Sequence, residues 1–124
     1  MICPKEKNMA YHLSINMKKH LKCIFSKFRF GVSSINTHFF RYRTHNNGQL
    51  LCPYCKYTKE NEIHFVLSCP LYKNIRKRFI KEKYYRNANM FKLRILFCSQ
   101  HHQTIEDLCH YLFLAFKIRE TFST

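Results

Sequence analysis

The 124-residue chain has only two glycines, three prolines and no tryptophan. So few turn-forming residues argue against an all-β protein with many tight turns. No apolar run approaches the roughly 20 residues that a membrane span requires, and the start of the chain has no apolar signal core. We therefore expect no membrane partner and no secretion. The length suits one domain with a modest core.

Acidic residues are scarce as well. Seven Asp and Glu stand against 22 Lys and Arg, which gives a formal net charge of +15, and no acidic residue lies between Lys7 and Lys59. This much uncompensated positive charge repels itself, so a polyanion is its natural partner. A solvated basic face kept for solubility is the alternative. No two carboxylates have polymerase or nuclease spacing, so we expect no catalytic residues, no enzymatic activity and no small-molecule substrate.

The cysteines, in contrast, form a pattern. The stretch 51–70 reads LCPYCKYTKENEIHFVLSCP and has the spacing Cys-x2-Cys-x8-His-x4-Cys, formed by Cys52, Cys55, His64 and Cys69. Three sulfurs and one imidazole are donors that a tetrahedral zinc site uses, and four protein ligands leave no open position for catalysis. The sequence therefore predicts one structural Zn²⁺ in a zinc segment over 50–72. The alternative is four unrelated residues, namely buried free thiols and a surface histidine.

Local turn chemistry supports the zinc interpretation. Pro53 fixes the backbone between the first two cysteines, so that both sulfurs can face one point. His64 is expected on a short helix over 61–67. Cys69 should follow the end of that helix, because the residue before Pro70 is pushed out of helical geometry. As the N-cap of the next helix, Cys69 should ionise readily beside free backbone N–H groups.

The remaining cysteines carry less information. Cys23, Cys98 and Cys109 fall within apolar helical patterns and are expected to be small buried residues. The odd cysteine count and the missing signal core favour a reducing interior, so we expect an intracellular protein of the nucleus or cytoplasm.

Apolar periodicity predicts a mainly α fold: a small helical domain with an embedded CCHC zinc knuckle and one short β-hairpin as an option. We expect a disordered tail over 1–13 and a single domain over 14–121. Helices are expected over 14–29, from Pro70, from Asn87 or Asn89, and from a capping box at Thr104. The hairpin would turn at 46–48 and lead into the knuckle. The residues expected to be buried together are Leu21, Ile24, Phe28, Ile75, Phe79, Leu108, Leu112 and Phe116.

Several segments also resemble a known family. They are Lys18-Lys19-His20 through Phe28-Arg29-Phe30, Arg41-Tyr42-Arg43, Glu60 through Phe65, Cys69-Pro70-Leu71-Tyr72, Asn89 through Lys92, and Leu108 through Leu112. Together they are similar to the cysteine-rich zinc-binding region that follows the reverse transcriptase domain in LINE-type (non-long-terminal-repeat) retrotransposons. Nothing in the chain resembles the polymerase palm or an endonuclease. The resemblance implies the tail of a longer protein whose parent would be an RNA-directed DNA polymerase.

Charge and resemblance together predict a nucleic-acid-binding domain that holds element RNA or target DNA during target-primed reverse transcription. The cations expected to contact phosphates are Lys18, Lys22, Arg29, Arg41, Arg43, Lys56, Lys59, Lys73, Lys77 and Lys81. Tyr42, Tyr54 and Tyr57 could stack on unpaired bases. One alternative is a non-catalytic module that docks on an upstream reverse transcriptase domain. Another is a remnant without function.

Overall fold

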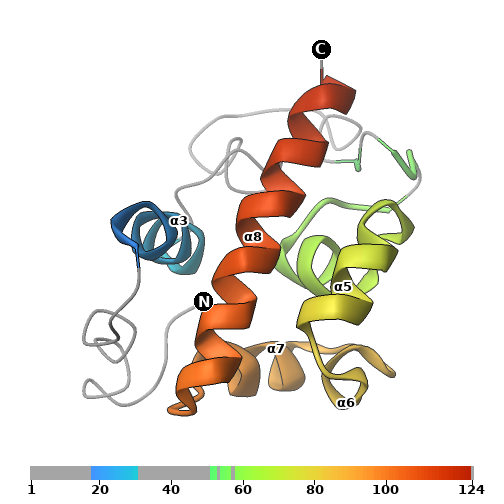
Figure 1. The fold of residues 1–124 in the computed structure, drawn as a ribbon. Helices are drawn as coiled ribbons and strands as arrows, with labels where there is room; N and C mark the ends of the chain where they lie inside the picture. Colours follow the sequence, from blue (N-terminus) through green and yellow to red (C-terminus); the bar gives the residue numbers. More distant parts are fainter. Residues whose placement is uncertain (1–17, 31–50, 53, 57, 124) are drawn as a thin grey trace.

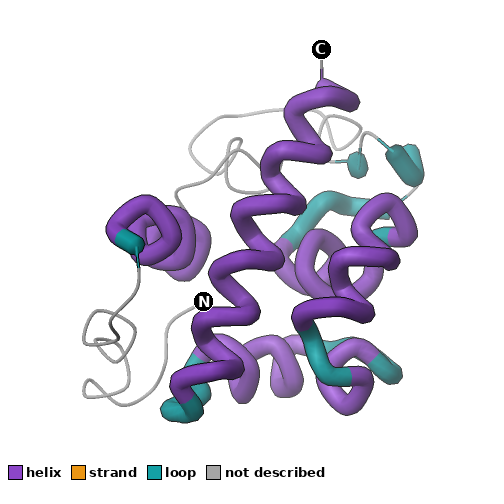
Figure 2. The backbone as a smooth tube through the Cα atoms, in the orientation of Figure 1, coloured by secondary structure: helices purple, strands orange, loops and turns teal. Residues whose placement is uncertain are grey.

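The computed structural model describes residues 18–30, 51–52, 54–56 and 58–123, and within them it is mostly helical (Figure 2). This confirms the mainly α prediction. The elements are α3 (Lys19–Arg29), η2 (His64–Ser68), η3 (Pro70–Tyr72), α5 (Lys73–Phe79), α6 (Glu82–Tyr85), α7 (Met90–Phe97) and α8 (His102–Ser123). Across the described ranges no helix is long and apolar enough to span a membrane. The expected tail lies outside these ranges.

Helix α8 is the central element. It packs between α3 on one side and α5 on the other, and α7 lies beneath its N-terminal end (Figure 1). Its buried side chains lie on more than one face: Ile105, Leu108, Cys109, Tyr111, Leu112, Ala115 and Arg119. Ile118 is partly buried and also packs against the core. Neighbours on two sides require a helix that is apolar over a broad arc.

The start of α8 differs from the predicted one. The helix begins at His102, ahead of the expected cap at Thr104. His101 takes the capping role, because its Nδ1 accepts a hydrogen bond from the Thr104 backbone N–H at 3.4 Å. His101 and His102 are both exposed, as expected. The sequence therefore placed the N-cap of α8 about one turn too late, because histidine is not among the usual capping residues.

Helix α3 buries the face formed by Leu21, Phe25 and Phe28. The Phe25 and Phe28 rings stack on Phe97 of α7, with ring centroids 5.2 and 5.4 Å apart. Arg29 belongs to the same face, because it follows Phe25 by one helical turn. It is only 1% exposed, so the prediction that it contacts phosphate is wrong for this structure. The expected N-cap at Ser14 lies outside the described residues.

Phe65 lies at the point where the zinc segment joins this core. Its ring centroid is 4.7 Å from that of Phe116, 5.0 Å from that of Tyr72 and 5.7 Å from that of Phe28. Tyr72 is fully buried. The expected core residues do form one cluster, within which Ile24, Ile75, Phe79 and Phe116 are partly buried.

The short elements between α5 and α8 depend on asparagine. Asn89 caps α7, with its side-chain oxygen accepting the Lys92 backbone N–H at 2.9 Å, which confirms one of the two predicted caps. Asn87, the other candidate, instead takes a φ of 52° after α6. Asparagine tolerates this left-handed conformation better than most residues.

The isolated cysteines only partly match the prediction. Cys109 is buried as expected, whereas Cys23 is exposed. Cys23 lies about 200° around the helix from Phe25, which places it opposite the buried face. Cys98 is partly buried and disulfide-bonded, so it is not the buried free thiol that we expected.

Candidate metal centre

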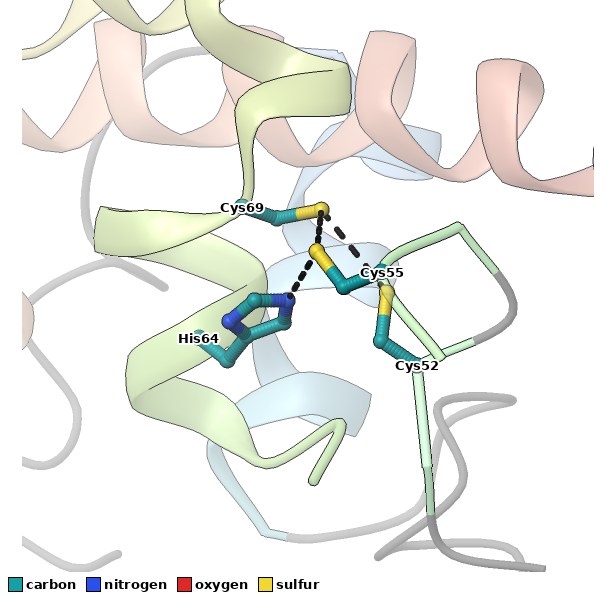
Figure 3. A group of neighbouring side chains, drawn as sticks. All are labelled: Cys52, Cys55, His64 and Cys69. Carbon is teal, nitrogen blue, oxygen red and sulfur yellow. Dashed lines mark hydrogen bonds between the residues drawn. The ribbon is translucent and has the colours of Figure 1, made fainter. Parts of the chain in front are cut away.

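Cys52, Cys55, His64 and Cys69 converge on one point (Figure 3). The Cys52 and Cys69 sulfurs are 3.8 Å apart, the Cys55 and Cys69 sulfurs 4.0 Å, and the Cys55 sulfur lies 3.5 Å from His64 Nε2. All four donor atoms lie within 4.8 Å of one another. These separations are about twice a disulfide bond length, so the sulfurs are not paired with each other. The four side chains could hold one metal ion, as the spacing predicted.

The first two cysteines come from a tight turn, which we call the knuckle (residues 51–60). The Lys56 backbone N–H donates to the Cys52 carbonyl at 2.8 Å, and the Cys52 N–H donates to the Thr58 carbonyl at 2.7 Å. Leu51 and Lys59 form an antiparallel bridge that closes the turn. The predicted hairpin before the knuckle lies outside the described residues, apart from Leu51, which pairs forward with Lys59 instead.

Lys56 adopts a φ of 67° in this turn. Knuckles often have glycine after the second cysteine, since only glycine takes the left-handed region without a steric cost. In this chain, Lys56 therefore adopts the left-handed backbone conformation that glycine often takes at this position. This side chain is exposed.

His64 and Cys69 come from a wide helical turn. Asn61 starts it, because its side-chain oxygen accepts the His64 N–H at 2.8 Å. The Cys69 N–H then donates to the His64 carbonyl at 2.7 Å, a bond five residues back that defines a π-helix. In a regular α-helix, residues five apart would point about 140° away from each other. The wider turn of η2 brings both donors to one side, with Cys69 just past the helix end as expected.

Burial controls the protonation of these ligands. Desolvation lowers the pKa of His64, which keeps its imidazole in the neutral form that binds metals. Desolvation also raises the pKa of the Cys69 and Cys55 thiols. The Leu71 backbone N–H lowers the pKa of Cys69, but burial outweighs it. The expectation that the helix start favours ionised Cys69 is therefore wrong for the metal-free site, and a bound cation has to supply that stabilisation.

Sequence reasoning missed a buried arginine behind the cluster. Arg76 Nε donates to the Val66 carbonyl and its Nη2 to the Cys69 carbonyl, both at 2.9 Å. The Tyr111 hydroxyl donates to the Phe65 carbonyl at 2.6 Å, so the two side chains satisfy carbonyls along η2 and just after it. Arg76 follows Tyr72 by four residues and therefore shares its buried face.

A second missed interaction joins the knuckle to α8. Arg119 Nε and Nη2 donate to the two carboxylate oxygens of Glu60, each at 2.7 Å. The Glu60 side chain is 1% exposed and that of Arg119 is 10% exposed. This bidentate pair is the best geometry available to arginine and a carboxylate. The pair spans 59 residues, so no local pattern could reveal it.

The predicted phosphate contacts fall into three groups. The exposed ones are Lys18, Lys56, Lys59, Lys73, Lys77 and Lys81, and Lys22 is partly buried. Arg29 is buried, as described above. Arg41 and Arg43 lie outside the described residues, together with Tyr42 and Tyr57, while Tyr54 is 44% exposed.

No protein-family model, no curated protein and no solved structure matches this chain. The resemblance to the retrotransposon region therefore stays a prediction from the sequence.

Proposed function

We propose that the Cys/His cluster binds one structural Zn²⁺. Zinc–sulfur bonds of about 2.3 Å and zinc–nitrogen bonds of about 2.0 Å place tetrahedral ligand atoms roughly 3.5–3.8 Å apart. Three of the six separations between donor atoms, at 3.8, 4.0 and 3.5 Å, are close to that geometry, and all six lie within 4.8 Å. Four protein ligands close the coordination shell, so the ion would stabilise the fold and would not activate water.

Around this centre, the domain would bind single-stranded or structured nucleic acid without catalysing a reaction. The observation that carries this proposal is the formal net charge of +15 together with the exposure of the lysines named above. Within the described part of the chain, Glu60 and Glu82 pair with Arg119 and Arg86, and no carboxylate pairs with those six exposed lysines. They are therefore available to phosphates.

The resemblance narrows the role. As a relative of the retrotransposon region, the chain would hold RNA or target DNA near an upstream polymerase. The burial of the metal ligands and the exposure of the lysines support two separate roles. The zinc would fix the backbone, and the lysines would provide the affinity for nucleic acid. The preference for RNA or DNA is left to the experiment.

Salt dependence tests the proposal. Zinc-loaded protein is titrated against a labelled single-stranded oligonucleotide at several salt concentrations, and each phosphate contact should add about 0.7–0.9 to the slope of log affinity against log salt. Arg41→Gln/Arg43→Gln should flatten the slope by about one unit per lost contact. Arg29→Gln is not an informative comparison variant, because the Arg29 side chain is buried. Undetectable binding at low salt by folded, zinc-loaded protein contradicts the proposal.

The docking module is the second candidate, and one observation favours it. Met90, Phe91 and Ile95 on α7 are 43%, 70% and 44% exposed. An apolar face of this kind would suit contact with another protein domain. Association through it would not weaken steeply with salt, so the same titration against a protein partner separates the two candidates.

A further inference from the structure

A pocket lies beside the metal centre, between the η2–α5 region and the turn that joins α6 to α7. Its volume is about 410 Å³, within the ~300–1,000 Å³ typical of ligand pockets. The residues that matter for its chemistry are Leu67, Ser68, Lys73, Arg76, Lys77 and Tyr85. None of the side chains that line it is acidic, so it is a strongly cationic site.

The charges are arranged at two depths. Lys73 and Lys77 are exposed and lie one helical turn apart on α5, so both reach the mouth of the pocket. Arg76 is 4% exposed and is held on the Val66 and Cys69 carbonyls. Its positive charge cannot move away, whereas the two lysines are mobile point charges. An anion at the mouth would gain from all three.

The rest of the wall is apolar and aromatic. Leu67 is buried, and Tyr85 is partly buried and packs against the core. Ser68 adds a hydroxyl from an exposed position. A flat aromatic group could rest against this side while an attached phosphate meets the lysines. A nucleotide has both parts, and a simple inorganic anion has only one.

We propose that this pocket binds one unpaired nucleotide of a single strand, with its base against Tyr85 and its phosphate on Lys73 and Lys77. The inference rests on the proposed nucleic-acid binding and locates one nucleotide contact in this pocket. Because Ser68 and the pocket-lining Pro70 flank the ligand Cys69, the metal centre would hold one wall of the pocket.

The test uses fluorescence anisotropy with the zinc-loaded full chain and a labelled hexanucleotide of uridine, its deoxyuridine counterpart, and the same backbone with abasic sites. Tyr85→Ala should weaken binding about 5- to 100-fold, the range of one lost base–aromatic stack, and Tyr85→Phe should bind like the native chain. The abasic strand should bind weakly to both the native chain and Tyr85→Ala. Similar affinity for uridine and deoxyuridine would indicate that the pocket does not read the sugar.

Charge is tested with a matched pair of double variants. Lys73→Gln/Lys77→Gln should flatten the salt slope by about 0.7, because the two lysines share one phosphate of a single strand. Lys83→Gln/Lys117→Gln removes the same net charge from exposed positions that do not line the pocket and should change the slope less. Equal effects of the two double variants overturn the pocket assignment.

Photo-crosslinking gives a readout that does not depend on a stable variant, which matters because Tyr85 contributes to packing. A 4-thiouridine-substituted strand should crosslink to the peptide that contains Tyr85. Crosslinks confined to other regions, with normal binding, overturn the pocket and leave the proposed function in place. Absence of binding to every strand overturns both.

Discussion

The two halves of the metal segment each supply two ligands, but they are attached to the rest of the molecule by different forces. The described part of the knuckle buries only the side chains of Cys52 and Glu60. The helical limb, residues 61–72, buries Phe65, Val66, Leu67 and Tyr72 in the common core. With the proposed metal, the knuckle would depend on the ion and one ion pair, whereas the limb depends on apolar packing.

Because of this difference, we do not expect the whole zinc segment to need the metal in order to fold. Apolar burial contributes about 25 cal/mol per Å², and the limb buries several large side chains with or without an ion. Arg76 and Tyr111 also satisfy carbonyls of the limb from α5 and α8. The knuckle is tied to α8 by the Glu60–Arg119 ion pair. Metal dependence should therefore be concentrated in the knuckle.

Loss of the metal should have the largest effect. Structural zinc binding is worth about 10–16 kcal/mol in small zinc domains, so Cys69→Ser should abolish stoichiometric metal content and open the knuckle. Hydrogen exchange should then show lost protection at the Cys52 and Lys56 amides, with protection retained in α8. Chelation of native protein is the matched control and should give the same pattern. Full metal retention by Cys69→Ser, or melting of α8 alongside the knuckle, contradicts this prediction.

Truncation in the limb should destabilise the whole domain. Phe65 is fully buried among other aromatic rings, so Phe65→Ala should lower the free energy of unfolding by about 3–5 kcal/mol. Phe116, one of the expected core residues, is partly buried, so Phe116→Ala should cost less. Urea denaturation of the metal-loaded variants checks the order. A larger loss for Phe116→Ala would mean that the limb is not the main anchor.

The sequence could reveal whatever depends on neighbouring residues. The spacing of Cys52, Cys55, His64 and Cys69 is local, as is the apolar face of α8, and the structure brings these residues together as predicted. No local sequence signal predicted the π-helical turn of η2. That turn brings the side chains of His64 and Cys69 to one point.

Long-range polar contacts could not be predicted in the same way. Arg29 was predicted to contact phosphate, yet Arg29, Arg76 and Arg119 are all buried. Arg76 and Arg29 each follow a buried aromatic residue by four residues. This spacing was the only local signal that the two arginines are buried. The partner of Arg119 lies 59 residues away, so its burial follows from the tertiary fold alone.

The link between knuckle and α8 should rank next in effect. Glu60→Leu removes the carboxylate that accepts both hydrogen bonds from the nearly buried Arg119, so it should cost about 3 kcal/mol, the lower end for a broken buried pair. The double variant Glu60→Leu/Arg119→Leu should recover much of that loss, because neither charge remains. A double-mutant cycle in urea measures the coupling. Additive losses would show that the pair does not hold the knuckle.

The smallest effect expected is a gain, at Lys56. Its φ of 67° lies in the left-handed region, which costs a residue with a Cβ about 1–2 kcal/mol, and part of that cost is offset by the greater freedom of glycine in the unfolded chain. Lys56→Gly should therefore stabilise the metal-loaded domain by about 1 kcal/mol, while Lys56→Ala keeps the strain and should not. Both variants remove one exposed charge and should flatten the salt slope of nucleic-acid binding equally, by about 0.7–0.9. Thermal denaturation and the salt titration measure the two effects separately. If lysine at this position serves phosphate contact at the expense of the turn, Lys56→Gly gains stability and loses affinity; a glycine variant that is less stable than the alanine variant would show that the knuckle turn is not strained.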